Sequence, residues 1–120
     1  MDLSVKEFAL EAASLLNEKK ALDIVLLELG QITLIADYFL ICSGSSKIQT
    51  RALSDYLEEG LSAKGRSPLR LEGYQEGNWI LQDYGELVVH IFFTEERSFY
   101  KLERLWGKAE AIDLQYLESH

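Results

Sequence analysis

Apolar residues recur at helical spacing in three segments of the chain, each with signals that mark its ends. Ser4 followed by Glu7 forms a capping-box pattern before the first segment, and Ser46 with Gln49 repeats that pattern before the second. Gly65 is placed to end the second helix. The spacing predicts helices over about Val5–Lys19, Ser46–Gly65 and Glu95–Trp106.

Shorter apolar runs between these segments are typical of strands. The run from Leu87 to Phe93 is apolar at both odd and even positions, which indicates a central strand covered on both faces. Asp83–Glu86 has the composition of a turn, and Glu72–Asn78 that of a loop. The predicted strands are Ile24–Leu29, Tyr38–Cys42, Leu69–Glu72, Trp79–Gln82 and Leu87–Phe93. The tail, Lys108–His120, is only weakly patterned.

The predicted order of elements is α-β-β-α-β-β-β-α, with no repeat or linker between them. A chain of 120 residues fits one domain, which we expect to cover residues 1–120 with its core at about 3–110. The economical arrangement is an α/β fold with a mixed sheet of about five strands flanked by helices. This architecture resembles nucleotidyltransferase-like folds.

The net charge of −8, from 20 acidic against 12 basic residues, indicates which kind of partner the protein binds. A protein that binds nucleic acid through phosphates normally carries a basic surface, so we expect little or no direct nucleic-acid contact. An acidic domain favours a basic protein partner. No apolar run is long enough for a membrane span, and the single cysteine, Cys42, fits a reducing compartment, so we expect a cytoplasmic protein.

Residue patterns for metal or nucleophilic chemistry are largely missing. The two histidines and Cys42 are far apart, which excludes zinc-type spacing. Glu72, Asp83 and Glu86 with His90 nearby would suit a hard cation, but turn carboxylates are usually solvated. His90 alternates into an apolar face, where a hydrogen-bonded, partly buried histidine is the simpler interpretation. The sequence therefore predicts no metal and no cofactor.

Phosphate binding is the strongest enzymatic alternative. Ser43–Ser46, with Gly44 inside it, falls between a strand and a helix, where backbone N–H groups can hold an anion, and Lys47 and Arg51 follow. Nucleotidyltransferases also need two or three carboxylates on an adjacent strand to hold Mg²⁺. Here the strand after the helix offers Glu72 alone. We therefore expect the scaffold without the catalytic carboxylates, and no enzyme.

Two surface patterns suit binding. A basic series on the last predicted helix, Arg97, Lys101, Arg104 and Lys108, fits either a solvated helix face or a local contact to RNA or an acidic patch. Aromatic residues among acids surround the predicted hairpin, where rings can anchor and carboxylates can steer a basic partner. These residues are Glu72, Tyr74, Glu76, Trp79, Asp83, Tyr84 and Glu86. Trp79 packed inward under a helix is the competing interpretation.

Four stretches together resemble the ribosomal silencing factor family, RsfS, also called Iojap-like. They are Asp37–Gly44, Glu72–Gly73, Trp79–Phe92 and Arg97–Trp106, and the resemblance covers roughly residues 3–110. It implies a nucleotidyltransferase-like fold without known enzymatic activity. It also implies binding to the large ribosomal subunit through protein uL-fourteen, on the face that meets the small subunit. By occupying that face, family members block subunit joining and repress translation during nutrient limitation; homodimers are seen.

The partner-binding residues expected from this reasoning lie on the hairpin and in the strands beside it: Trp79, Asp83, Tyr84, Glu86, Glu72, Gly73, Asp37 and Tyr38. Gly73 and Gly85 are expected to be backbone requirements, and Asp37 a turn residue. Glu86 stands where the family usually carries Asp, and Ser98 where an acidic residue is common. Two alternatives stay open, a large-subunit assembly factor and a nucleotide-handling enzyme.

Overall fold

The computed structural model describes residues 4–30, 36–95 and 110–114 of the chain. The first helix, α1 (Val5–Glu18), begins at the predicted capping box: the Ser4 hydroxyl accepts from the Glu7 N–H at 3.1 Å. The second, α2 (Lys47–Ser62), is capped by the Ser46 hydroxyl, which accepts from the Gln49 N–H at 3.0 Å. Gly65 takes a φ of +83° just after this helix, as expected for a residue that turns the chain away.

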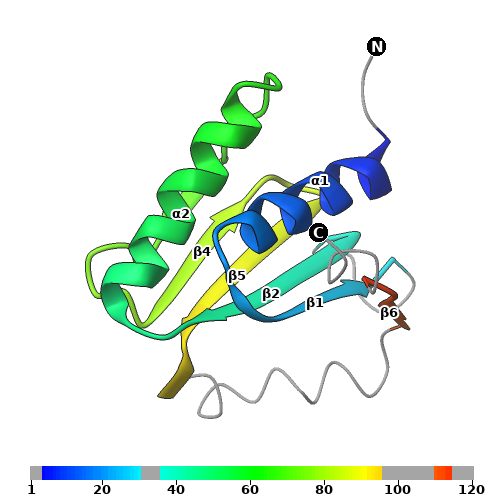
Figure 1. Ribbon diagram of the computed structural model, residues 1–120. Coiled ribbons are helices and arrows are strands. Elements are labelled where there is room, and N and C mark those ends of the chain that lie inside the picture. Colours follow the sequence, from blue (N-terminus) through cyan, green and yellow to red (C-terminus); the bar gives the residue numbers. More distant parts are fainter. Residues whose placement is uncertain (1–3, 31–35, 96–109, 115–120) are drawn as a thin grey trace.

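The strands form one six-stranded sheet in the order β3-β4-β5-β2-β1-β6 (Figure 1). Among the strands of the described residues, only β2 and β5 run parallel to each other, so the sheet is mixed, as predicted. The strands are β1 (Leu22–Glu28), β2 (Tyr38–Gly44), β3 (Arg70–Glu72), β4 (Trp79–Asp83), β5 (Leu87–Phe93) and β6 (Glu110–Ile112). Strand β5 lies between β4 and β2, which confirms its predicted central place.

The sheet carries two apolar clusters, one on each face. Helices α1 and α2 cover one face of the sheet (Figure 1). The larger cluster lies on that face and includes Phe8, Leu57, Leu40 and Val89. Side chains of the alternate strand positions, including Ile41 and Phe92, form the second cluster on the opposite face. This division decides which face each site residue can reach.

One prediction differs from the structure, and the structure does not test another. The expected count of about five strands missed β6, which forms within the weakly patterned tail by pairing Glu110–Ile112 with β1. The partner strand β1 lies far away in the chain, so no local sequence signal marks this short strand. The predicted helix Glu95–Trp106 and its basic series Arg97, Lys101, Arg104 and Lys108 lie beyond Glu95 and so outside the described residues. Within the described part, no helix is long and apolar enough to cross a membrane.

Candidate functional site

The turn between β4 and β5 is fixed by its own side chains and backbone. The Asp83 carboxylate accepts from the Gly85 N–H at 2.8 Å, and the Tyr84 N–H donates to the Leu87 carbonyl at 2.8 Å. Gly85 has a φ of +91°, a conformation that residues with a Cβ rarely adopt. One carboxylate oxygen of Asp83 therefore stabilises the turn, and the other oxygen is available to a different partner.

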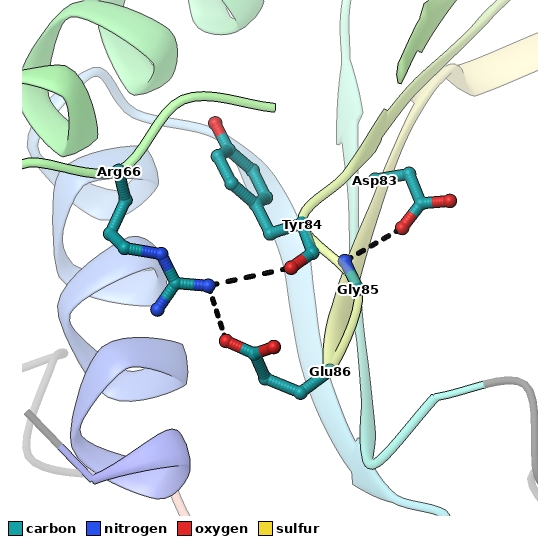
Figure 2. A network of polar contacts seen from close by, with 5 residues as sticks. All are labelled: Arg66, Asp83, Tyr84, Gly85 and Glu86. Atoms are coloured by element: carbon teal, nitrogen blue, oxygen red, sulfur yellow. Dashed lines mark hydrogen bonds and ion pairs between the residues drawn. The ribbon is translucent and has the colours of Figure 1, made fainter. Parts of the chain in front are cut away.

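An arginine from the segment after α2 holds the same turn from the helix side, as Figure 2 shows. The Arg66 guanidinium pairs with the Glu86 carboxylate and donates to the Tyr84 carbonyl at 3.4 Å. The guanidinium also lies over the Phe8 ring of α1, 4.2 Å from its centroid, in a cation–π contact. Arg66 thus ties the turn to the first helix, and nothing in the sequence analysis pointed to it.

A second unpredicted arginine, Arg70, joins two of the expected site residues on the outer strands. Its guanidinium lies 3.2 Å from the second Asp83 oxygen and 2.9 Å from the Glu72 carboxylate. The register of β3 and β4 sets this arrangement, because Arg70 is directly opposite Asp83. The Glu72 side chain is 56% exposed, whereas that of Asp83 is 20% exposed. A carboxylate pair bridged by one guanidinium therefore lines this edge of the sheet.

The start of β2 joins the turn through its backbone. The Glu86 carbonyl accepts from the N–H groups of Asp37 and Tyr38, at 2.9 and 3.0 Å. Asp37 is exposed, whereas the Tyr38 ring is buried. Burial, followed by the charges of Glu28 and Asp37, raises the pKa of Tyr38 above its ordinary value. The structure thus brings Asp37 and Tyr38 together with the turn, as the sequence analysis expected.

Tyr84 points into the core. Its side chain is 3% exposed, meets Phe8 edge-on, and donates its hydroxyl to the Gln82 side chain at 2.6 Å. Gln82 in turn donates to the Ser54 hydroxyl and carbonyl on α2. Burial raises the pKa of the Tyr84 phenol, with a smaller contribution from Glu58, so it stays a hydrogen-bond donor. The ring is not available on the surface as an anchor.

Trp79 lies at the other end of β4, about 13 Å from Asp83 by the rise of a strand. It is half-buried on the face opposite the helices, whereas Tyr84 lies beneath them. The expected grouping of these two rings is therefore not what the structure shows. Tyr74 is also separate, because its hydroxyl donates to Asp55 on α2. Gly73 packs against the start of β4: a Cβ there would come within 2.0 Å of the Trp79 carbonyl oxygen.

His90 is the histidine beside this tryptophan. The Trp79 indole N–H donates to His90 Nδ1 at 3.0 Å, and the imidazole is 4% exposed. Burial lowers the pKa of His90 to about 4, so the ring is neutral at physiological pH. The hydrogen-bonded, buried interpretation of His90 is the one that the structure supports.

Three donors at the loop before α2 have internal partners. The Gln49 side chain accepts from both the N–H and the hydroxyl of Ser45, and the Ser46 hydroxyl accepts from the Gln49 N–H. These are groups that an anion would have to use. Across residues 4–30, 36–95 and 110–114, no cluster of His, Cys, Asp and Glu is arranged to hold a metal ion. The loop therefore forms the capped start of α2.

Sequence comparison places the chain in a family. The family model described as "Ribosomal silencing factor during starvation" matches residues 2–120. The chain belongs to this family. Its description names a regulatory role, not a catalytic one. A Halalkalibacterium halodurans protein named ribosomal silencing factor RsfS is 41% identical over 113 residues, which cover 94% of this chain and 97% of the relative.

A more distant relative and a solved structure extend this result. A mouse protein named "Mitochondrial assembly of ribosomal large subunit protein 1" is 32% identical over 96 residues, which cover 78% of this chain and 42% of the relative. The crystal structure of a Chromobacterium violaceum protein matches with a TM-score of 0.84 and 30% identity, covering 88% of both chains. The mixed α/β architecture of this family member is thus shared by a protein solved by crystallography.

Proposed function

We propose that this member of the silencing-factor family binds protein uL-fourteen of the large ribosomal subunit and sterically blocks joining of the small subunit. Translation is thereby repressed during nutrient limitation. The family match over residues 2–120 is the observation that carries the proposal. A blocker of this kind needs affinity for one subunit and enough bulk to clash with the other. An interface of about 800 Å² per partner would suffice.

The surface proposed for the partner combines carboxylates with one aromatic ring. Asp37 and Glu72 are exposed, Asp83 and Glu86 partly so, and Trp79 is half-buried on the face away from the helices. Together with the net charge of −8, these carboxylates would steer a basic protein surface toward the turn. Trp79 would supply the apolar anchor. Tyr38, Tyr84 and Gly73 contribute by fixing the strands and turns that present the others.

Light scattering during reassociation of purified large and small subunits tests the mechanism. The protein is incubated with the large subunit first, and the scattering increase on adding small subunits is followed over time. Suppression of joining at stoichiometric protein is the expected result. Normal joining, with the protein still sedimenting on large subunits, would overturn the blocking mechanism.

An Asp83→Asn variant tests the surface more cleanly than a charge reversal. Asparagine keeps an oxygen that can accept from the Gly85 N–H, so the turn is preserved while the charge is lost. We expect weaker sedimentation with large subunits, by roughly three- to tenfold in Kd. Glu59→Gln, an exposed carboxylate on α2, is the matched control and should bind normally. Equal binding by both variants would discard Asp83 as a contact.

Trp79→Ala should weaken binding to large subunits as well.

Large-subunit assembly is the second candidate function, because the mouse relative carries that role in its name. An assembly factor would bind immature large subunits in preference to mature ones and leave the joining of mature subunits untouched. Sedimentation with both classes of particle, run beside the scattering assay, distinguishes the two functions.

The protein is further proposed to act in the cytoplasm, without cofactor or catalysis, with little or no direct contact to nucleic acid and no contact to a membrane. A nucleotide-handling enzyme would need Mg²⁺-dependent nucleotide binding near Ser45, where the donors already have internal partners. Thermal shift with nucleotides and Mg²⁺ tests this, and we expect no shift in the melting temperature.

A homodimer is proposed as the free form, which analytical ultracentrifugation would detect.

A further inference from the structure

The Trp79 indole is held from two directions by the neighbouring strand β5. Its N–H donates to His90 Nδ1 at 3.0 Å, and its ring stacks on Phe92 with the centroids 5.1 Å apart and the planes at 27°. In the antiparallel register Trp79 is directly opposite Phe92, and His90 is the diagonal neighbour on the same face. Two specific side chains of β5 therefore help to orient the half-buried ring.

His90 is an unusual choice for its position if packing were its only role. Because Nδ1 accepts the indole N–H, the proton of the neutral ring must sit on Nε2. Nε2 is buried and has no hydrogen-bond partner among the described residues. An unsatisfied buried N–H lowers the stability of the folded state, and an apolar residue of similar size would avoid this loss. What the histidine adds is an acceptor aimed at the indole.

We propose that His90 is a positioning residue, which fixes the Trp79 indole in the orientation that meets the partner protein on the large subunit. This inference rests on the proposed function. Its physical basis is preorganisation: a large side chain that is already ordered loses less conformational entropy on binding. His90 itself lies beneath the surface and acts only through the tryptophan.

Two substitutions at this position separate the acceptor from the volume. His90→Leu fills a similar space without any acceptor, whereas His90→Asn places an amide oxygen near the position of Nδ1. Affinity for large subunits is measured by sedimentation at increasing protein concentration. We expect His90→Leu to weaken binding roughly three- to tenfold and His90→Asn to stay within about twofold of the parent. The urea unfolding midpoint of His90→Leu should be no lower than that of the parent.

Hydrogen exchange of the indole N–H in the free protein reports the positioning without any ribosome. The Trp79 signal in a nitrogen-15 NMR spectrum is assigned with a Trp106→Phe variant, which removes the only other tryptophan. Slow exchange is expected in the parent and in His90→Asn, and faster exchange in His90→Leu. A lost hydrogen bond would appear here even where the fold is as stable as before.

The outcomes distinguish failure of the proposed function from failure of the positioning role of His90. If the parent does not sediment with large subunits, the proposed function fails, while the exchange data still show whether His90 orders the indole. If the parent binds and Trp79→Ala does not, yet His90→Leu binds like the parent, the positioning role is overturned. Equal loss of binding in His90→Leu and His90→Asn would also overturn it, because the acceptor would then be irrelevant.

Discussion

Two buried polar networks lie on opposite faces of the sheet and differ in how fully their hydrogen bonds are satisfied. On the helix face, Gln82 donates to the Ser54 carbonyl and hydroxyl at 2.9 and 2.8 Å, and accepts from the Tyr84 hydroxyl at 2.6 Å. On the opposite face, Trp79 donates to His90, whose other nitrogen has no partner among the described residues.

The difference separates a network that stabilises the fold from one that does not. The first network joins α2, β4 and the turn, and each of its bonds replaces one that water would make in the unfolded chain. The second leaves the buried Nε2 of His90 without a partner among the described residues, next to a ring that is partly exposed. We therefore expect substitutions on the helix face to change stability, and those on the other face to change binding and acid tolerance.

The largest expected effect is on the pH dependence of stability, and it comes from His90 in the Trp79–His90 pair. Burial lowers the pKa of His90 from 6.5 to about 4. Between these pH values the histidine is therefore protonated in the unfolded chain and neutral in the folded chain. The free energy of unfolding should then fall as the pH falls through this window, by about 3 kcal/mol in total, and stay free of this contribution above pH 6.5.

His90→Asn is the reference for this measurement. Urea unfolding of both proteins at pH 7, 5.5 and 4.5 gives a difference in which the carboxylates common to both chains largely cancel. We expect the stability of the parent relative to the variant to decrease toward low pH. A difference that is the same at all three values would contradict the burial argument.

A matched leucine substitution on the two faces gives the next effect. Gln82→Leu removes both donations to Ser54 and leaves the buried Tyr84 hydroxyl without its acceptor. We expect a loss of about 2 to 3 kcal/mol in the free energy of unfolding. His90→Leu at pH 7 should cost no stability, because it also removes a buried nitrogen that has no partner among the described residues. Urea unfolding at pH 7 compares them, and equal costs would erase the distinction between the faces.

Much of the fold could be predicted because its signals are local. The Ser4 and Ser46 caps each involve a residue only three positions away. The apolar positions of both described helices recur at helical spacing within each segment, so they can be read from the local sequence. The two-sided apolar pattern of Leu87–Phe93 likewise reflects burial of the strand on both faces, in the two apolar clusters of the sheet. Strand β6 could not be predicted, since it exists only through pairing with β1, which lies far away in the chain.

The site was harder to predict because distant residues hold it. Arg66 and Arg70 meet Glu86 and Asp83 across 20 and 13 positions, and only the strand register and the path of the chain after α2 bring them together. The separation of Trp79 from Tyr84 did have a signal. Strand alternation places odd and even positions on opposite faces, so extending the parity of β4 into the turn would have divided these two rings.

The smallest expected effect tests whether the helix-face network is as redundant as its geometry indicates. Ser54→Ala removes one of the two acceptors of the Gln82 amide, but the Ser54 carbonyl remains at 2.9 Å. Alanine also favours the helix slightly over serine. We expect a loss of only about 0.5 kcal/mol in urea unfolding and unchanged sedimentation with large subunits. A loss comparable to that of Gln82→Leu would mean that the hydroxyl, and not the backbone carbonyl, holds the glutamine, and the contrast between the faces would then depend on one side-chain bond.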